Sequence, residues 1–415
     1  MATQRHLGSA LAAACLIVGA LVSGCGGSSS PAANTADVNG VTSASASTVT
    51  LPSPSATATS AAPSASPSKS SASPSPKVHT APLSAGNPNG HAAIPAAAQP
   101  ADTSHPTHVV GNGTSASCTS AAVVSAVAAG GVITFSCGAD PVVIAMRSTA
   151  KVRNAASDHI VIDGGGKVTL SGGGARRILY LDTCDQAQGW TTSHCQNQEY
   201  PQLTVQNLTF ENGDSTGQTT DGGGGGAIFD RGDRLKIVNS RFVGNRCDST
   251  GPDLGGAAVR ALSQWQNEPV YVVSSTFGGA SGLGGVCSNG GALSSIGVSW
   301  VVLNSVMTYN QAIGVGANPA RGGTPGGGSG GAIYTDGNQY TVTIDGSIIE
   351  HNTAREGGGA VFYVSNDRTG TLAIRDSTLS GNPSKGFWTN GFPGIFFLGS
   401  GKPAVSGSTL SCPCS

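Results

Sequence analysis

Apolar and polar residues alternate in a pattern that recurs seven times between residues 203 and 410. Each copy has an apolar anchor, and successive anchors lie 30 to 42 residues apart: Phe210, Phe242, Phe277, Met307, Ile349, Leu379 and Leu410. Five positions before each anchor stands a β-branched residue: Val205, Ile237, Val272, Val302, Ile344, Ile374 and Val405. Because side chains along a strand point alternately to opposite faces, the pattern predicts strands with one face on a core and a strongly fixed register.

Polar and small residues occupy fixed places in the same repeat. Two positions before the anchor six copies have serine, and three positions after it four copies have asparagine, at 245, 310, 352 and 382. A second element begins with Gly-Gly-Ala and gives a column of small residues: Ala227, Ala257, Ala292, Ala332 and Ala360. If the copies stack as parallel strands about 4.8 Å apart, like polar side chains can hydrogen-bond from copy to copy. The sequence therefore predicts a solenoid of stacked coils.

With these elements, residues 118–415 resemble bacterial right-handed parallel β-helix proteins, and the paired FxxN and GGAI elements are similar to the repeats of chlamydial polymorphic outer-membrane proteins. The resemblance implies an all-β, right-handed parallel β-helix with a pectin-lyase-like fold over residues 106–415. A short capping helix is expected after Cys118, since Thr119 or Ser120 can cap it and Gly130 can end it. The fold hosts enzymes, phage tailspikes and adhesins, so it does not specify a function.

Composition narrows the classes of partner. Only 10% of the 415 residues are charged, 62 are glycine, and the formal net charge is −1 without a run of lysine or arginine. A nucleic-acid-binding protein needs a basic surface for the phosphate backbone, so we expect no nucleic-acid partner. We expect a monomer that binds a polysaccharide or another cell-surface ligand.

The N-terminal region predicts export. An apolar run from Leu7 to Val22 is too short for a good membrane span and ends in LVSGC, which resembles the lipobox of bacterial lipoproteins. The resemblance implies a signal peptide over residues 1–24 and lipidation of Cys25; the alternative is an ordinary signal peptide cleaved nearby. Residues 25–105 are rich in Ser, Ala, Pro and Thr and predict a disordered stalk. We expect an extracytoplasmic protein that meets the membrane through its lipid anchor only.

Eight of the ten cysteines lie beyond residue 100, an even number that favours disulfides in an exported protein. Cys118 and Cys137 flank the expected capping helix. Two further pairs would close loops in the repeat region, although the number of cysteines allows many pairings. The candidates are Cys118 with Cys137, Cys184 with Cys195, and Cys247 with Cys287, and Cys412 and Cys414 complete the set.

Two segments are candidates for catalysis. Glu350 and His351 follow an anchor where other copies have residues typical of turns, which favours a surface turn over an acid/base pair. Asp230, Asp233 and Arg260 follow Gly-Gly-Ala elements, and the repeat aligns Arg260 with Asp230, so stacked coils would bring these charges together on one face. They are the candidate acids and base of an enzyme; the alternative is an exterior ion-pair patch.

Known enzymes of this fold offer few matching motifs. Of the polygalacturonase elements only Arg234-Leu235-Lys236 comes close to its counterpart, and pectate-lyase signatures are absent. No metal or cofactor site is predicted, and Ca²⁺ would be expected only for a lyase.

Phe229, Tyr334 and Phe362 share a column two positions after the Gly-Gly-Ala alanine. They would form a sugar-stacking stripe if this column faced outward, or pack in the core if it faced inward. The sequence thus favours a surface-anchored polysaccharide-binding protein or adhesin. The alternatives are a lyase or glycoside hydrolase acting on uronate-containing polymers, and a structural component of the cell envelope.

Overall fold

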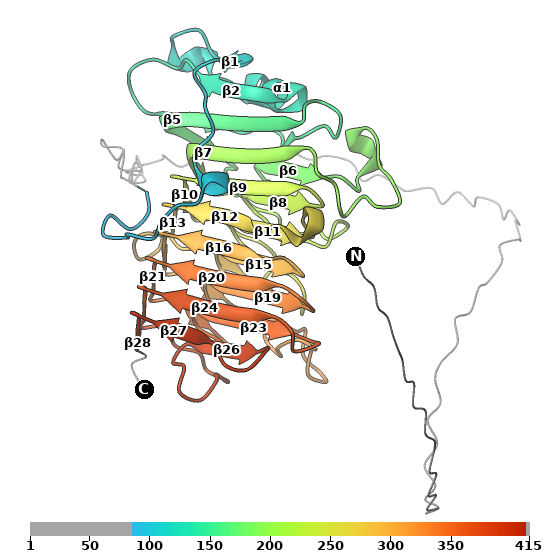
Figure 1. Ribbon diagram of the computed structural model, residues 1–415. Helices are drawn as coiled ribbons and strands as arrows, with labels where there is room; N and C mark the ends of the chain where they lie inside the picture. Colours follow the sequence, from blue (N-terminus) through green and yellow to red (C-terminus); the bar gives the residue numbers. More distant parts are fainter. Residues whose placement is uncertain (1–84, 412–415) are drawn as a thin grey trace, which may run out of the picture. The chain divides into compact units, whose positions relative to one another are not determined.

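The computed structural model describes residues 85–411, all of which belong to the second of two units of the chain, Ser75–Ser415. This part is mostly sheet, built from parallel strands with one α-helix, and successive turns of chain stack as the coils of a parallel solenoid. The stack begins at β1 and β2 and ends at β26, β27 and β28 (Figure 1). The predicted all-β parallel architecture is therefore confirmed. No helix within residues 85–411 is long and apolar enough to cross a membrane.

The largest sheet of the described region has seventeen strands in two ladders, which the long strands β5 and β7 join. One ladder contains β1 (His108–Val110), β2 (Gly131–Phe135), β5 (His159–Ser171), β7 (Gln202–Glu211), β9 (Arg234–Val238), β12 (Val270–Val273), β16 (Trp300–Leu303), β20 (Thr341–Asp345), β24 (Thr371–Arg375) and β27 (Ala404–Ser406). The other adds β3 (Val142–Ala145), β10 (Arg241–Val243), β13 (Thr276–Phe277), β17 (Val306–Thr308), β21 (Ile348–Glu350), β25 (Thr378–Ser380) and β28 (Thr409–Ser411).

Two further sheets complete the coils described here. The eight-stranded sheet contains β4 (Ala150–Lys151), β6 (Leu179–Asp182), β8 (Ile228–Arg231), β11 (Val259–Leu262), β15 (Leu293–Ile296), β19 (Ile333–Gly337), β23 (Val361–Ser365) and β26 (Ile395–Leu398). The small sheet contains β14 (Val286–Cys287), β18 (Gln311–Ala312) and β22 (Thr353–Ala354). Short 3₁₀ turns lie at Ala96–Ala98 (η1), Ser115–Ser117 (η2), Gln186–Gln188 (η3) and Trp265–Asn267 (η4).

The register matches the sequence repeat. All seven anchors pair with one another from strand to strand, and so do the seven β-branched residues five positions earlier. Most of these side chains lie in the main hydrophobic core, and Val405 and Leu410 at the end of the stack pack against it. Burial of the apolar face fixes this register, because a slip by one residue would expose the whole set.

The predicted polar ladders also form. The amide of each serine donates to the hydroxyl of the next, as Ser275 does to Ser305 (3.1 Å) and Ser305 does to Ser347 (3.0 Å). In the asparagine column, Nδ2 of Asn310 donates to Oδ1 of Asn352 (2.9 Å), and Asn352 donates to Asn382 in the same way. These buried amides are thereby satisfied at the corners, where the backbone cannot continue its strand ladder.

The Gly-Gly-Ala element has a steric explanation. Gly330 has φ +70°, a conformation that residues with a side chain avoid, and a Cβ on Gly331 would lie 2.1 Å from the carbonyl oxygen of Gly359 in the next coil. One member of the alanine column was misassigned, because the second alanine of the GGAAV copy, Ala258, takes the core position. Ala257 packs instead beside a disulfide. That coil carries one extra residue, which shifts the residues of β11 by one position.

The cap and the disulfides agree with the prediction. Helix α1 (Ser120–Ala129) starts at Thr119, whose side chain accepts from the Ala122 amide, and ends at Gly130 with φ +77°. The expected disulfides Cys118–Cys137, Cys184–Cys195 and Cys247–Cys287 are all present. Cys412 and Cys414, like Cys25 and the signal peptide expected over residues 1–24, lie outside the described residues.

The expected boundary of the stalk at residue 105 was wrong, because residues 85–105 lie against the large sheet (Figure 1, blue). Asn304 exchanges two hydrogen bonds with Ala92 (2.8 and 3.0 Å), and Ala98 is fully buried against Val238, Val273 and Leu303. Further along, Thr103 donates to Asp163 (2.9 Å). The segment thus crosses the coils against the direction of stacking and covers apolar residues on the outer face of the sheet.

Candidate functional site

A cavity of about 500 Å³ lies on the outer face of the eight-stranded sheet, at its β4, β6 and β8 end. Lys151, Tyr180, Asp182 and Arg231 come from these strands. The other lining residues come from the chain on either side: Thr149, Arg177, Cys184, Asp185, Gly217, Gln218, Thr220 and Asp221. We call this cavity the charged groove.

Strand alternation explains how β6 builds the groove. Leu179 and Leu181 point into the core, so Tyr180 and Asp182 point out. In the neighbouring strands Tyr180 pairs with Lys151 and Phe229, and Asp182 pairs with Arg231. Parallel pairing in register therefore places a lysine, a tyrosine, an aspartate and an arginine from three coils on one outer face.

The cations of the groove differ in how firmly they are held. Arg177 is buried, forms an ion pair with Asp221 (2.6 Å) and donates to the carbonyls of Gly224 and Gly225, so its role is to hold the loop. Arg231 lies 3.8 Å from Asp182, at the limit of an ion pair, and is a quarter exposed. The Lys151 ammonium lies 4.8 Å from the centre of the Tyr180 ring and is exposed. Lys151 and Arg231 are thus available to an anionic ligand.

Three groups at the floor of the groove form a small network. The Tyr180 hydroxyl lies 3.3 Å from Oδ2 of Asp182 and 3.3 Å from Oδ2 of Asp185, so the two oxygens are at most twice that distance apart. Burial raises the pKa of Asp182. Although burial has the same tendency at Asp185, hydrogen bonds from the Gln188 side chain and the Ala187 amide outweigh it and lower the pKa of that carboxyl. The two carboxyls therefore differ in their readiness to hold a proton.

The Asp230 and Asp233 carboxyls are both fully buried and do not reach this groove. Asp230 shares its column with Leu181 and Ala261, both core residues, and so faces the interior of the solenoid. The Gln264 amide donates to its Oδ2 (2.6 Å). Burial raises the pKa of both carboxyls, that of Asp230 to about 7. The expectation that they face outward was wrong, because an acidic side chain here interrupts the apolar side of the alternation.

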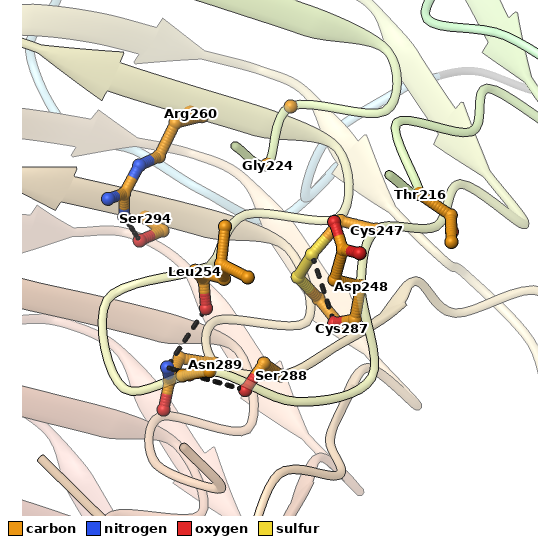
Figure 2. Close-up of a disulfide and its surroundings, with 12 residues drawn as sticks. Thr216, Gly224, Cys247, Asp248, Leu254, Arg260, Cys287, Ser288, Asn289 and Ser294 are labelled. Carbon is orange, nitrogen blue, oxygen red and sulfur yellow. Dashed lines mark hydrogen bonds between the residues drawn. A yellow bond between two sulfur atoms is a disulfide. The ribbon is translucent and has the colours of Figure 1, made fainter. Parts of the chain in front are cut away.

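Arg260 was also misplaced, since it pairs with Phe229 and not with Asp230. The extra residue before it turns its side chain to the opposite side of the sheet. There it is buried under the loop that follows Cys247 and donates to the Ser294 hydroxyl (2.5 Å) (Figure 2). The three candidate catalytic residues therefore do not share one face.

The loop that covers Arg260 is itself firmly built. The Cys247–Cys287 disulfide joins its start to β14 (Figure 2). The Asn289 amide donates to the carbonyls of Gly251, Pro252 and Leu254, at 3.2, 2.9 and 2.9 Å. The disulfide and the Asn289 hydrogen bonds therefore hold this loop in place over Arg260, which stays enclosed.

The aromatic column faces away from the core but is covered. Phe229 and Tyr334 are fully buried and Phe362 is 3% exposed. Phe362 stacks on Tyr334 and Phe396, with ring centres 5.0 Å apart in both pairs, and Phe229 stacks on Tyr180 at 5.4 Å. The column therefore faces outward, as a sugar-stacking stripe requires, but neighbouring rings and loops leave it no free face for a sugar.

Glu350 and His351 lie where the sequence placed them, at the end of β21 and in the turn after it. Glu350 accepts a hydrogen bond from the Ser380 hydroxyl (2.6 Å), and His351 is exposed with φ +57° and stacks on Tyr309. Each of these two side chains contacts a residue of a neighbouring coil. They form a corner of the solenoid.

Sequence reasoning missed the groove residues Lys151, Tyr180, Asp182 and Asp185. Alternation in Leu179-Tyr180-Leu181-Asp182 was the available signal, because two leucines on one face place a tyrosine and an aspartate on the other.

Within residues 85–411 no group of three or more His, Cys, Asp or Glu side chains is arranged to hold a metal ion. Comparison with family models, with curated proteins and with solved structures finds no match to this chain.

Proposed function

We propose that this protein is an extracytoplasmic, lipid-anchored adhesin that binds a uronate-containing polysaccharide in the charged groove. The groove carries the proposal: two available cations, a tyrosine and several carboxylates line one cavity on the outer face of a solenoid. Lys151 and Arg231 would pair with uronate carboxylates, the aspartates would accept hydrogen bonds from sugar hydroxyls, and Gln218 would accept or donate them.

The fold and the anchor belong to the same proposal. Parallel strands joined by crossover connections are almost always right-handed, which supports a right-handed β-helix of the pectin-lyase type. The LVSGC segment supports lipidation of Cys25. The three disulfides fit an oxidising compartment outside the cytoplasm.

The test is titration of the folded domain with oligogalacturonate of six residues. Lys151→Ala and Arg231→Ala should each weaken binding tenfold or more, and the loss should shrink at high salt because screening already weakens the wild-type interaction. The exposed Lys402→Ala serves as the matched control, since Lys402 lies outside the groove. Equal affinity of all four proteins would contradict the proposal.

One observation favours a second function, hydrolysis of the bound chain. Asp182 has a raised pKa and Asp185 a lowered one, and both contact the Tyr180 hydroxyl, which is the division expected of an acid and a base or nucleophile. New reducing ends should then appear on incubation with polygalacturonate. Asp182→Asn should abolish them, while the folded variant still binds oligogalacturonate. Absence of any new ends with the wild-type protein would exclude hydrolysis of this polymer.

A further inference from the structure

A second cavity, of about 470 Å³, lies beside the turn that precedes β7. Its size falls in the range of small-molecule sites, about 300–1,000 Å³. It is lined by Asn154, Ala155, Ser157, Asp158, Trp190, Gln198, Glu199 and Tyr200. We call it the aromatic pocket. None of the chemistry assigned to the charged groove uses these residues.

Two partly exposed aromatic side chains distinguish this pocket from the covered aromatic column. Trp190 and Tyr200 are each 37% exposed. The His159 ring packs edge-on against Tyr200, with ring centres 5.6 Å apart, which restrains the tyrosine. Aromatic faces carry a partial negative charge and attract the positively polarised C–H groups on the face of a sugar ring. Trp190 and Tyr200 thus offer the stacking surface that Phe229, Tyr334 and Phe362 cannot.

The pocket also holds an unpartnered polar atom. Asn154 is 4% exposed, and its Nδ2 donates to the carbonyl of Trp190 (2.8 Å) and more weakly to that of Thr183 (3.4 Å). Its Oδ1 is buried without a hydrogen-bond partner. A buried acceptor without a donor costs free energy in the unliganded protein. The same side chain positions Trp190, so the acceptor and the stacking surface are built together.

The charges of the aromatic pocket select against anions. Its lining contains the carboxylates of Asp158 and Glu199 and no lysine or arginine. A uronate would be repelled here, whereas the hydroxyls of an uncharged sugar can donate to both carboxylates. The two cavities therefore favour different sugars.

One loop links the cavities. The Cys184–Cys195 disulfide closes a short loop whose first residues, Cys184 and Asp185, line the charged groove and whose Trp190 lines the aromatic pocket. Asp185 starts the η3 turn in this loop, and its side chain accepts from the Ala187 amide (2.9 Å). The disulfide therefore fixes one wall of each cavity at once.

We propose that the aromatic pocket is a second carbohydrate site, which binds a neutral pyranose ring on Trp190 and Tyr200. Together with the charged groove, the aromatic pocket would recognise a polysaccharide that carries both uronate and neutral sugars. This inference rests on the proposed function, since it adds a second specificity to the same ligand class.

The test uses two kinds of probe on the oxidised, folded domain. The neutral hexasaccharides of glucose, xylose and mannose report on the aromatic pocket, and oligogalacturonate reports on the charged groove. Trp190→Ala and Tyr200→Ala should each weaken binding of at least one neutral probe tenfold or more and leave oligogalacturonate binding within twofold. Trp388→Ala is the matched control, because Trp388 is 56% exposed and lies in neither cavity.

The outcomes separate the two proposals. If oligogalacturonate binds and no neutral probe does, the aromatic pocket is not a neutral-sugar site, while the proposed function stands. If a neutral probe binds equally well to Trp190→Ala, the pocket assignment is wrong. Binding of glucosamine oligomers without binding of neutral probes would also overturn it, because the carboxylates would then select a cation. Retained oligogalacturonate binding and an unchanged thermal unfolding curve show that each variant is folded.

Discussion

At the residue scale, the least expected feature is a pair of acids inside the solenoid. With both groups ionised, no side chain donates a hydrogen bond to Oδ1 of Asp230 or to either oxygen of Asp233. A proton on Asp233 can be donated to Asp230, whose other oxygen is bonded to Gln264. Two like charges in a low-dielectric interior are strongly unfavourable, so burial and mutual repulsion keep at least one proton on the pair.

This pair should make stability depend on pH. The unfolded carboxyls lose their protons near pH 4, whereas the folded pair, with the pKa of Asp230 at about 7, keeps them longer. The folded state then binds more protons than the unfolded state, so the free energy of unfolding falls as pH rises from about 4 to 7. Each pKa unit corresponds to about 1.4 kcal/mol, so the loss is on the order of a few kcal/mol.

Asp233→Asn should therefore flatten the fall of melting temperature between pH 4 and 7 and stabilise the protein at pH 7. Asparagine keeps the shape and can donate to Asp230 without a charge. The measurement is thermal unfolding by circular dichroism across this pH range. The exposed Asp140→Asn should reproduce the wild-type profile. A profile unchanged by Asp233→Asn would mean that the pair does not titrate in this range.

At the element scale, the Gly-Gly-Ala strand entry determines how closely the coils approach. Its first glycine turns the chain at positive φ, and its second faces a backbone carbonyl of the adjoining coil, as Gly330 and Gly331 show. The following alanine fills the core without pushing the coils apart. The Gly-Gly-Ala motif therefore serves close packing of adjoining coils.

Gly331→Ala should lower the stability of the domain. Its Cβ would sit 2.1 Å from the Gly359 carbonyl oxygen, and overpacking in a close-packed interior costs roughly 1–3 kcal/mol. Gly322→Ala is the control, since Gly322 is exposed and a Cβ there meets nothing within 4 Å. Urea unfolding should show a lower midpoint for Gly331→Ala and a change of about 0.5 kcal/mol or less for Gly322→Ala. Equal midpoints would show that the coils can move apart freely.

At the scale of the whole molecule, the domain extends further toward the N-terminus than composition suggested. Residues 85–105 cross the coils and shield the apolar patch of Val238, Val273 and Leu303 from solvent. Such coverage matters in a solenoid, because exposed apolar surface on a sheet face invites association. A truncated protein that starts at residue 106 would lack this cover, so binding experiments should use a domain that begins before residue 85.

The proposed lipid anchor concerns the whole molecule. Cys25→Ala should move the protein from the membrane fraction to the medium or the soluble extracytoplasmic fraction, because the acyl chains that would hold it there are lost. Fractionation and metabolic labelling with a fatty acid provide the measurement. Cys15→Ala is the matched control and should stay labelled and in the membrane fraction. Retention of Cys25→Ala in the membrane fraction with full acyl labelling would refute the lipobox interpretation.

The solenoid and the register of its strands could be predicted from the amino-acid sequence alone. Alternation around Ile344 and Ile349, the serine and asparagine columns and the flanking cysteines are local or strictly periodic signals. Each corresponds to one physical requirement: an apolar face must be buried, a corner amide must be bonded, and a loop must be closed. The apolar and serine positions recur from coil to coil, so each copy of the repeat supports the interpretation of the next.

Which residues gather on one face depends on three-dimensional packing and could not be predicted from the repeat. A single extra residue at Ala257 turned Arg260 to the other side of the sheet, and an acid at Asp230 occupies the interior, where a periodic rule expects an apolar side chain. The charged groove joins Lys151, Tyr180 and Arg231, which span 80 residues of sequence and meet because parallel coils stack in register. Loops without periodicity complete the walls of both cavities, and their positions depend on packing and on a disulfide that no repeat encodes.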